Sequence, residues 1–137
     1  MSYEAWGEPD DSPFEAAIEA GWIDPTDLSK ATIDILNERD RQVNDEGWTS
    51  AHDDQHIDFS LSRAAIAYAT CAAVGPIDRT ILDAHGAAGA TSAVKALWPI
   101  GWSTRWFKPT SRRRDLIKAA ALLIAEIERL DRMEPQP

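Results

Sequence analysis

The sequence has one cysteine, no continuous apolar run of about 18 residues that would cross a bilayer, and no basic, apolar start typical of a secretory signal. Its first residues, MSYEAWGEPDDSPFEAA, carry acids instead. A lone thiol forms no internal disulfide, so Cys71 in AIAYATCAAV is expected to be a small buried residue. We therefore expect a protein of the reducing cytoplasm that does not bind a membrane.

Strand patterns are also missing, because β-branched residues never alternate with polar ones over a useful length. The 137 residues are 44% hydrophobic and 27% charged, as in a single folded domain. The fold class expected is all-α, a compact helical bundle in which a Trp- and Pro-rich loop precedes a long C-terminal helix. Its expected parts are an acidic extension with a short helix at 1–26, a helical domain at 27–133 and a disordered tail at 134–137.

Helix boundaries are predicted from capping residues and from glycine or proline stops. Helices are expected over 13–20, over 24–47, and from a cap at Asp58 or Ser60 to Gly75. Two short pieces, IDRTILDAH and SAVKAL, flank the flexible GAAGA. Thr110 or Ser111 caps the last helix, whose apolar stripe is expected to face the core: Leu116, Ala120, Leu123, Ile127 and Leu130. This amphipathic helix and the small-residue stretch SRAAIAYA also predict a homodimer.

Charge is distributed unevenly along the chain, whose formal net charge is −9. Residues 1–58 hold 16 acids and three bases, a net −13, whereas residues 59–137 hold 11 bases and seven acids, a net +4. The halves either attract one another within the fold or across a dimer, or the acidic half imitates nucleic acid, or the basic half receives an anion. Binding to duplex nucleic acid is the poorest fit, because the net charge repels phosphates and no continuous basic stripe occurs.

The stretch EGWTSAHDDQH at 46–56 supplies nitrogen and oxygen donors from His52, Asp53, Asp54 and His56. On a helix the two histidines would share one face, as in two-histidine zinc sites. The stretch follows a glycine, however, and neither HExxH nor a third ligand at diagnostic spacing is present. We therefore expect no metal or other cofactor, with a divalent metal as the weaker alternative. The favoured interpretation is an inward-facing hydrogen-bonding loop anchored by Trp48.

Three sequence blocks resemble a family of small phage and prophage proteins: NERDRQVNDEGWTSAHDDQH, SRAAIAYA and FKPTSRRRDLIKAAALLIAEIERLDR. They span residues 37–132 in order, and Phe107 stands where the family has a tryptophan before its lysine-proline pair. The resemblance implies a phage-type protein of the host cytoplasm, one that interferes with a host signal or defence pathway. It assigns no function to residues 1–36 or 76–97.

An enzymatic alternative is the all-α nucleoside-triphosphate pyrophosphohydrolase, which phages carry. Such enzymes hold magnesium with an ExxE on one helix and an ExxD on the next. Glu128 and Asp131 provide an ExxD, but Arg41 stands three residues after Glu38, so the ExxE is missing. No nucleophile motif or phosphate-binding glycine loop occurs either. A non-enzymatic binding protein is therefore favoured.

The binding hypothesis rests on the run of arginines that opens the last helix. Arg112 and Arg113 lie in a first turn, where free N–H groups already favour an anion, and Trp106 and Lys108 just upstream add a flat face and a charge. We expect a phosphorylated or nucleotide-like ligand in a cleft completed by residues from the acidic half: Arg39, Trp48, His52, Asp54 and His56. Two alternatives stay open. In the first, the tryptophans only cover the core and the arginines form ion pairs with Asp53, Asp54 and Glu38. In the second, the acidic face of the protein binds and inhibits a host protein.

Overall fold

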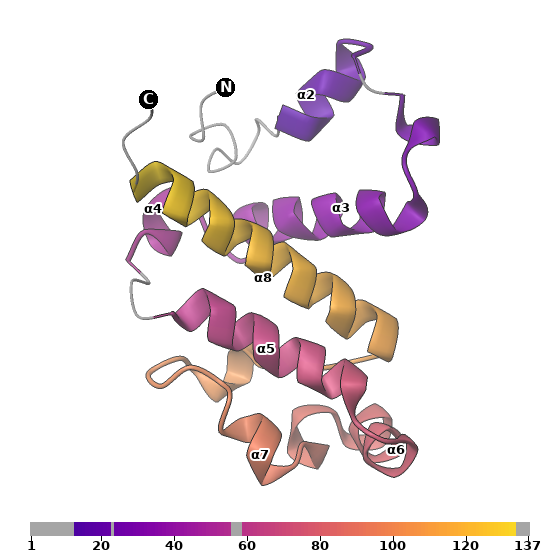
Figure 1. Cartoon of the computed structure of the whole chain (residues 1–137), viewed down its shortest axis with the longest axis vertical. Coiled ribbons are helices and arrows are strands. Elements are labelled where there is room, and N and C mark those ends of the chain that lie inside the picture. The colour runs from indigo at the N-terminus through magenta and orange to yellow at the C-terminus, as the bar shows by residue number, and fades with distance from the viewer. Residues whose placement is uncertain (1–12, 23, 56–58, 134–137) are drawn as a thin grey trace. The chain divides into compact units, whose positions relative to one another are not determined.

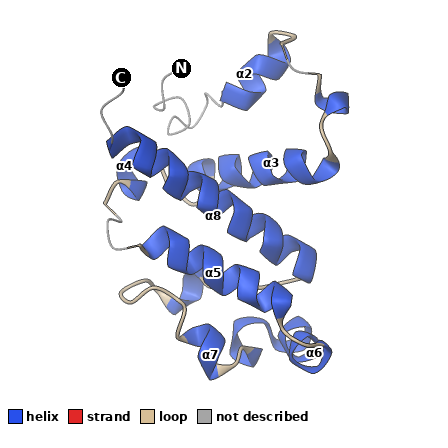
Figure 2. Cartoon of the chain, viewed as in Figure 1, coloured by secondary structure: helices blue, strands red, loops and turns tan. Residues whose placement is uncertain are grey.

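The computed structural model describes residues 13–22, 24–55 and 59–133, and every regular element within them is a helix (Figure 2). The all-α prediction is confirmed. The chain forms two compact units, the first from residues 1–57 and 124–137 and the second from residues 58–123. The long helix α8 (Arg112–Met133), labelled in Figure 1, contributes residues 112–123 to unit 2 and residues 124–133 to unit 1. None of the described helices is long and apolar enough to span a membrane.

Unit 1 contains α2 (Pro13–Glu19), the 3-10 turn η1 (Pro25–Asp27), α3 (Lys30–Asn44) and α4 (Ser50–Asp53), besides residues 124–133 of α8. The single helix predicted over 24–47 is wrong at its start. Asp24 accepts hydrogen bonds from the Thr26 N–H and hydroxyl, which closes a separate turn. The hydroxyl of Ser29 then accepts from the Thr32 N–H at 3.1 Å and caps α3. Gly47, in the left-handed region at φ +74°, lies just beyond the helix as predicted.

Unit 2 contains α5 (Ser60–Ala73), α6 (Pro76–His85), the 3-10 turn η2 (Gly86–Gly89), α7 (Ser92–Lys95) and the 3-10 turn η3 (Thr104–Trp106), besides residues 112–123 of α8. The two short helices on either side of GAAGA are confirmed. The cap predicted for α5 is not: Phe59 occupies that position in a left-handed conformation and makes no side-chain cap bond, and Asp58 lies outside the described residues. For α8 the Ser111 hydroxyl accepts from the Arg114 N–H at 3.2 Å, as predicted.

The alanine-rich helix α5 forms the centre of the unit 2 core. Its inward side consists of apolar and small residues, with Leu61 and Ala65 almost fully enclosed. Cys71 is buried too, as predicted, and burial raises the pKa of its thiol to about 11. The thiol is therefore protonated at neutral pH, which suits a packing residue rather than a nucleophile.

The core face predicted for α8 is wrong. Four residues of the predicted stripe are substantially exposed: Leu116 at 47%, Leu123 at 46%, Ile127 at 57% and Leu130 at 46%. The buried face consists instead of small, apolar and charged residues: Asp115, Ile117, Ala119, Ala121, Leu122, Ala125, Glu126, Glu128 and Arg129. Charged groups tolerate burial here because they are paired within their units, as Asp115 is with Arg79 and Glu128 with Arg39. Apolar periodicity alone therefore identified the wrong side.

Candidate functional site

The structure describes a pocket of about 360 Å³ in unit 2, lined by Ala87, Ala88, Lys95, Trp98, Thr104 and Phe107. This volume lies at the small end of the range found for ligand pockets. The residues come from η2, α7, η3 and the loop between α7 and α8. The lining residues are two aromatics, two alanines, one lysine and one threonine. That composition suits a flat apolar group carrying a polar or anionic substituent.

The aromatic wall of the pocket belongs to a larger cluster of rings. Trp98 and Phe107 pack with their centroids 4.9 Å apart, and both are buried. Trp102 meets Trp98 edge-on at 5.5 Å, and Trp106 in turn meets Trp102 at 5.7 Å. The indole N–H of Trp98 donates to the Ser103 carbonyl at 3.2 Å, which fixes the ring plane. The wall is therefore held in place without a ligand.

Tyr68 holds the tryptophan-rich loop against α5. Its hydroxyl donates to the Trp106 carbonyl and accepts from the Lys108 N–H, both at 3.0 Å. Its ring packs against Phe107 at 5.4 Å, and the Lys118 ammonium lies 5.4 Å above the ring. One hydroxyl therefore satisfies two backbone groups, at the end of η3 and just beyond it.

Two basic residues lie on or beside α7, and one of them, Lys95, lines the pocket. Among the described residues, no hydrogen bond or ion pair engages the ammonium of Lys95, which lies on the exposed last turn of α7. Arg63 on α5 donates to the Ala96 carbonyl at 3.3 Å, so a second cation stands beside the end of α7. Unit 2 as a whole holds nine bases and four acids, a net charge of +5. This field attracts anions.

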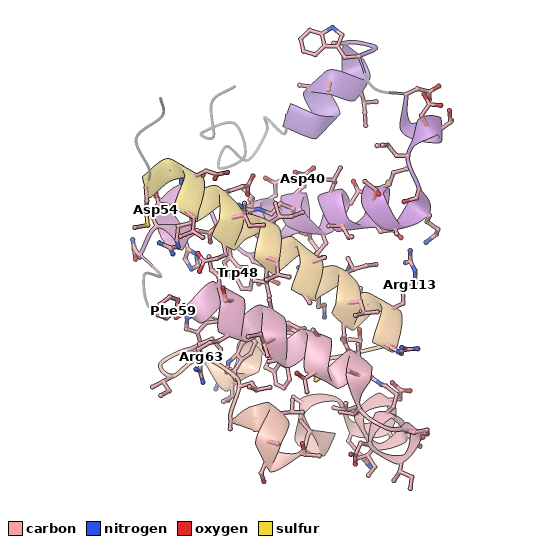
Figure 3. The ribbon with its side chains drawn as sticks, in the orientation of Figure 1. Asp40, Trp48, Asp54, Phe59, Arg63 and Arg113 are labelled. Atoms are coloured by element: carbon pink, nitrogen blue, oxygen red, sulfur yellow. The ribbon has the colours of Figure 1, made fainter. Side chains whose placement is uncertain are left out.

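The predicted site residues of unit 2 do not line the pocket. Trp106 is half-exposed at the outer edge of the ring cluster, and the Lys108 carbonyl accepts from Lys118 at 2.6 Å. Arg112 donates from Nε to the Ala72 carbonyl at 2.9 Å, which ties the start of α8 to the end of α5. Arg113 is exposed (Figure 3). Two buried members of the tryptophan-rich stretch, Trp98 and Phe107, line the pocket in place of the predicted Trp106 and Lys108.

The predicted site residues of unit 1 form a polar network in that unit. The Arg39 side chain, fully buried, donates from Nε to Glu128 at 3.0 Å and from Nη2 to Asp53 at 3.2 Å. Asp53 also contacts Nδ1 of His52 at 3.2 Å, and the His52 ring stacks parallel to Trp48 at 6.1 Å. Burial raises the pKa of Glu128, although Arg39 acts in the opposite direction. His56 lies outside the described residues.

Two of the acids that the sequence could have paired with the arginines at the start of α8 have arginine partners within unit 1. Asp54 is bound by Arg132 in the last turn of α8, at 2.7 and 3.0 Å. Glu38 is bound by Arg41 at 2.7 and 2.8 Å. Trp48 and Asp54 belong to unit 1, whereas Arg113 belongs to unit 2, so the predicted set is divided between the units (Figure 3).

The nitrogen and oxygen atoms of His52, Asp53 and Asp54 that could ligate a metal contact other protein groups instead. Asp53 binds Arg39 and His52, and Asp54 binds Arg132. Glu128 of the ExxD pattern is bound to Arg39. Within the described ranges, no group of three or more histidine, cysteine or acidic residues is arranged to hold a metal ion.

Comparison with known proteins adds no relative: no family model, no curated protein and no solved structure matches the chain.

Proposed function

We propose that the protein is a small-molecule-binding protein whose unit 2 pocket takes a nucleotide-like ligand, one ring system with an acidic group. The single observation that carries this proposal is the pairing, in one 360 Å³ pocket, of the Trp98–Phe107 wall with the ammonium of Lys95. Aromatic faces stack on nucleobases, and a lysine at the rim binds a phosphate as a point charge.

The direction of charge supports an anionic ligand. Unit 2 carries a net +5 in a chain of net −9, so an anion approaching the molecule is drawn to this unit and repelled by the other. Arg63 beside α7 adds to the local field. Interference with a host signal, which the phage resemblance implies, would then consist of sequestering such a ligand.

The proposal is a binding function and not a catalytic one. The lining provides one ammonium and one hydroxyl, with no carboxylate or imidazole among its six residues to act as general base. A ligand held there is expected to leave unchanged.

A thermal-shift panel tests this proposal. Mono-, di-, tri- and cyclic nucleotides and ADP-ribose forms are added with and without magnesium, and each stabilising mixture is chromatographed afterwards. We expect stabilisation by a mononucleotide-sized anion that is recovered intact. A cleaved product would overturn the non-enzymatic assignment, and a panel without stabilisation would overturn the nucleotide-like ligand.

A further inference from the structure

Arg63 and Lys95 form a pair of cations at the end of α7 in unit 2. Arg63 lies on α5 and donates from Nη2 to the carbonyl of Ala96, the residue that follows Lys95, at 3.3 Å. Both basic residues are exposed. Within the described ranges, the Ala96 carbonyl is the only hydrogen-bond or ion-pair partner of the Arg63 guanidinium, and the Lys95 ammonium has none. The remaining N–H groups of Arg63 are therefore available to a ligand.

The acids of unit 2 that the structure describes do not neutralise these two cations. Asp83 and Asp115 both bind Arg79, each at 2.9 Å. Asp78 lies in the first turn of α6 and forms no ion pair with either cation. Two cations held close together repel one another, and an anion that contacts both relieves this repulsion.

The two cations differ in their position relative to the pocket. Lys95 lines the pocket together with Trp98, whereas neither Arg63 nor Ala96 is among the lining residues. An anionic group at Lys95 therefore lies in the pocket, and one at Arg63 lies just beyond it, at the end of α7. Two phosphates in a chain have this arrangement, because the second extends away from the first and from the ring system.

We infer that the ligand is a nucleoside diphosphate, whose first phosphate binds Lys95 and whose terminal phosphate binds Arg63. The inference rests on the proposed nucleotide-like ligand and names its class. A lysine ammonium binds a phosphate as a point charge, whereas the arginine fork can donate two parallel N–H bonds to a terminal phosphate. The bond to Ala96 engages only Nη2, which leaves donors on Nε and Nη1 of Arg63.

Arg113 offers a matched control for the charge of the unit. It is exposed in the first turn of α8, in the part of that helix that belongs to unit 2, and Figure 3 shows it well away from Arg63. Glutamine at either position removes one positive charge from unit 2. A loss of affinity confined to Arg63→Gln therefore reports a local contact and not the general field of the unit.

Isothermal titration of the full chain with AMP and with ADP, in magnesium-free buffer, tests the inference. The wild type is expected to bind ADP about tenfold more tightly than AMP. Arg63→Gln should remove this advantage while the affinity for AMP stays within about twofold of wild type, and Arg113→Gln should retain the advantage. Arg63→Lys keeps the charge without the fork and should restore part of it. Because Arg63 is exposed, its replacement should leave the melting temperature nearly unchanged.

The possible outcomes distinguish this inference from the proposed function. Equal binding of AMP and ADP to the wild type, or an ADP advantage that survives in Arg63→Gln, would overturn the diphosphate while the pocket remains a nucleotide site. An equal loss of AMP and ADP affinity in Arg63→Gln would show one phosphate shared by both cations and would also overturn it, as would an equal effect of Arg113→Gln. Binding of neither compound to the wild type would overturn the proposed function itself.

Discussion

The hydroxyl of Tyr68 donates to the Trp106 carbonyl at 3.0 Å, and this contact joins helix α5 to the loop that carries the pocket's aromatic wall. The same hydroxyl accepts from the Lys108 N–H, so one atom fixes the chain on both sides of Phe107. Phe107 lines the pocket. The shape of the pocket therefore depends on a bond that no ligand would touch.

Removing that hydroxyl should loosen the loop. Tyr68→Phe keeps the ring packing but leaves the Trp106 carbonyl and the Lys108 N–H without their partner, so the free energy of unfolding should fall by about 1–3 kcal/mol in urea titrations. Thr80→Val is a matched control, because the Thr80 hydroxyl is exposed and bonds only within its own helix. Equal stability of the two variants would show that the Tyr68 hydroxyl does not hold the loop.

The pocket's alanine wall depends on Gly89, at the end of η2. A Cβ added there would stand 2.7 Å from the Ile81 carbonyl oxygen and 2.8 Å from Cγ2 of Ile81. Gly89→Ala should therefore displace η2 and cost about 1–3 kcal/mol of stability. Gly75→Ala is the control, since its Cβ would meet nothing within 4 Å at an ordinary φ of −65°. Calorimetry that finds both variants alike would contradict this packing.

The buried arginine of unit 1 should be far more sensitive than a surface cation. Arg39→Met leaves Asp53 and Glu128 buried without their guanidinium, which should lower the free energy of unfolding by about 3–5 kcal/mol. Lys30→Met removes an exposed pair with Asp34 and should cost no more than about 0.5 kcal/mol. Chemical denaturation measures both, and an Arg39 variant as stable as the Lys30 variant would show that the network does not stabilise unit 1.

The burial of Glu128 should make the free energy of unfolding depend on pH in a definite direction. Burial raises its folded-state pKa above the usual 4.5, so the folded state holds this proton more tightly than the unfolded chain. Its contribution to stability is then complete below about pH 4.5 and is lost as pH rises through the folded pKa. Glu128→Gln removes this loss, so its stability relative to wild type should increase from pH 4.5 upward. A relative stability that falls over this range would mean that Arg39 outweighs desolvation.

The sequence predicted the helices well because capping and stop signals are local. Ser111 and the GAAGA turn act within a few residues, so they need no knowledge of the fold. The buried side of α8 could not be predicted from such local signals. Its alanines and charged residues are buried only because partners such as Arg39 and Arg79, distant in sequence, neutralise Glu128 and Asp115. Periodicity cannot reveal those partners.

The candidate site could be predicted in part for a similar reason. The clustered tryptophans of WPIGWSTRWFKP indicated an aromatic loop. Which of its rings line the pocket depends on how Tyr68 holds the loop, and Tyr68 lies forty residues before its partner Lys108. Ala87, Ala88 and Lys95 have no motif at all and reach the pocket through the α6–η2–α7 turns. Opposite charge along the sequence likewise could not show which base binds Asp54, whose partner Arg132 lies 78 residues further on in the same unit.

The most direct test of the pocket compares AMP with adenosine by isothermal titration into the wild type, Lys95→Met and the surface control Lys30→Met. The proposed function predicts that the wild type binds AMP more tightly than adenosine, that Lys95→Met removes this difference by weakening AMP, and that Lys30→Met retains it. A phosphate preference that survives the loss of Lys95, or no saturable binding of either compound to the wild type, would contradict the account.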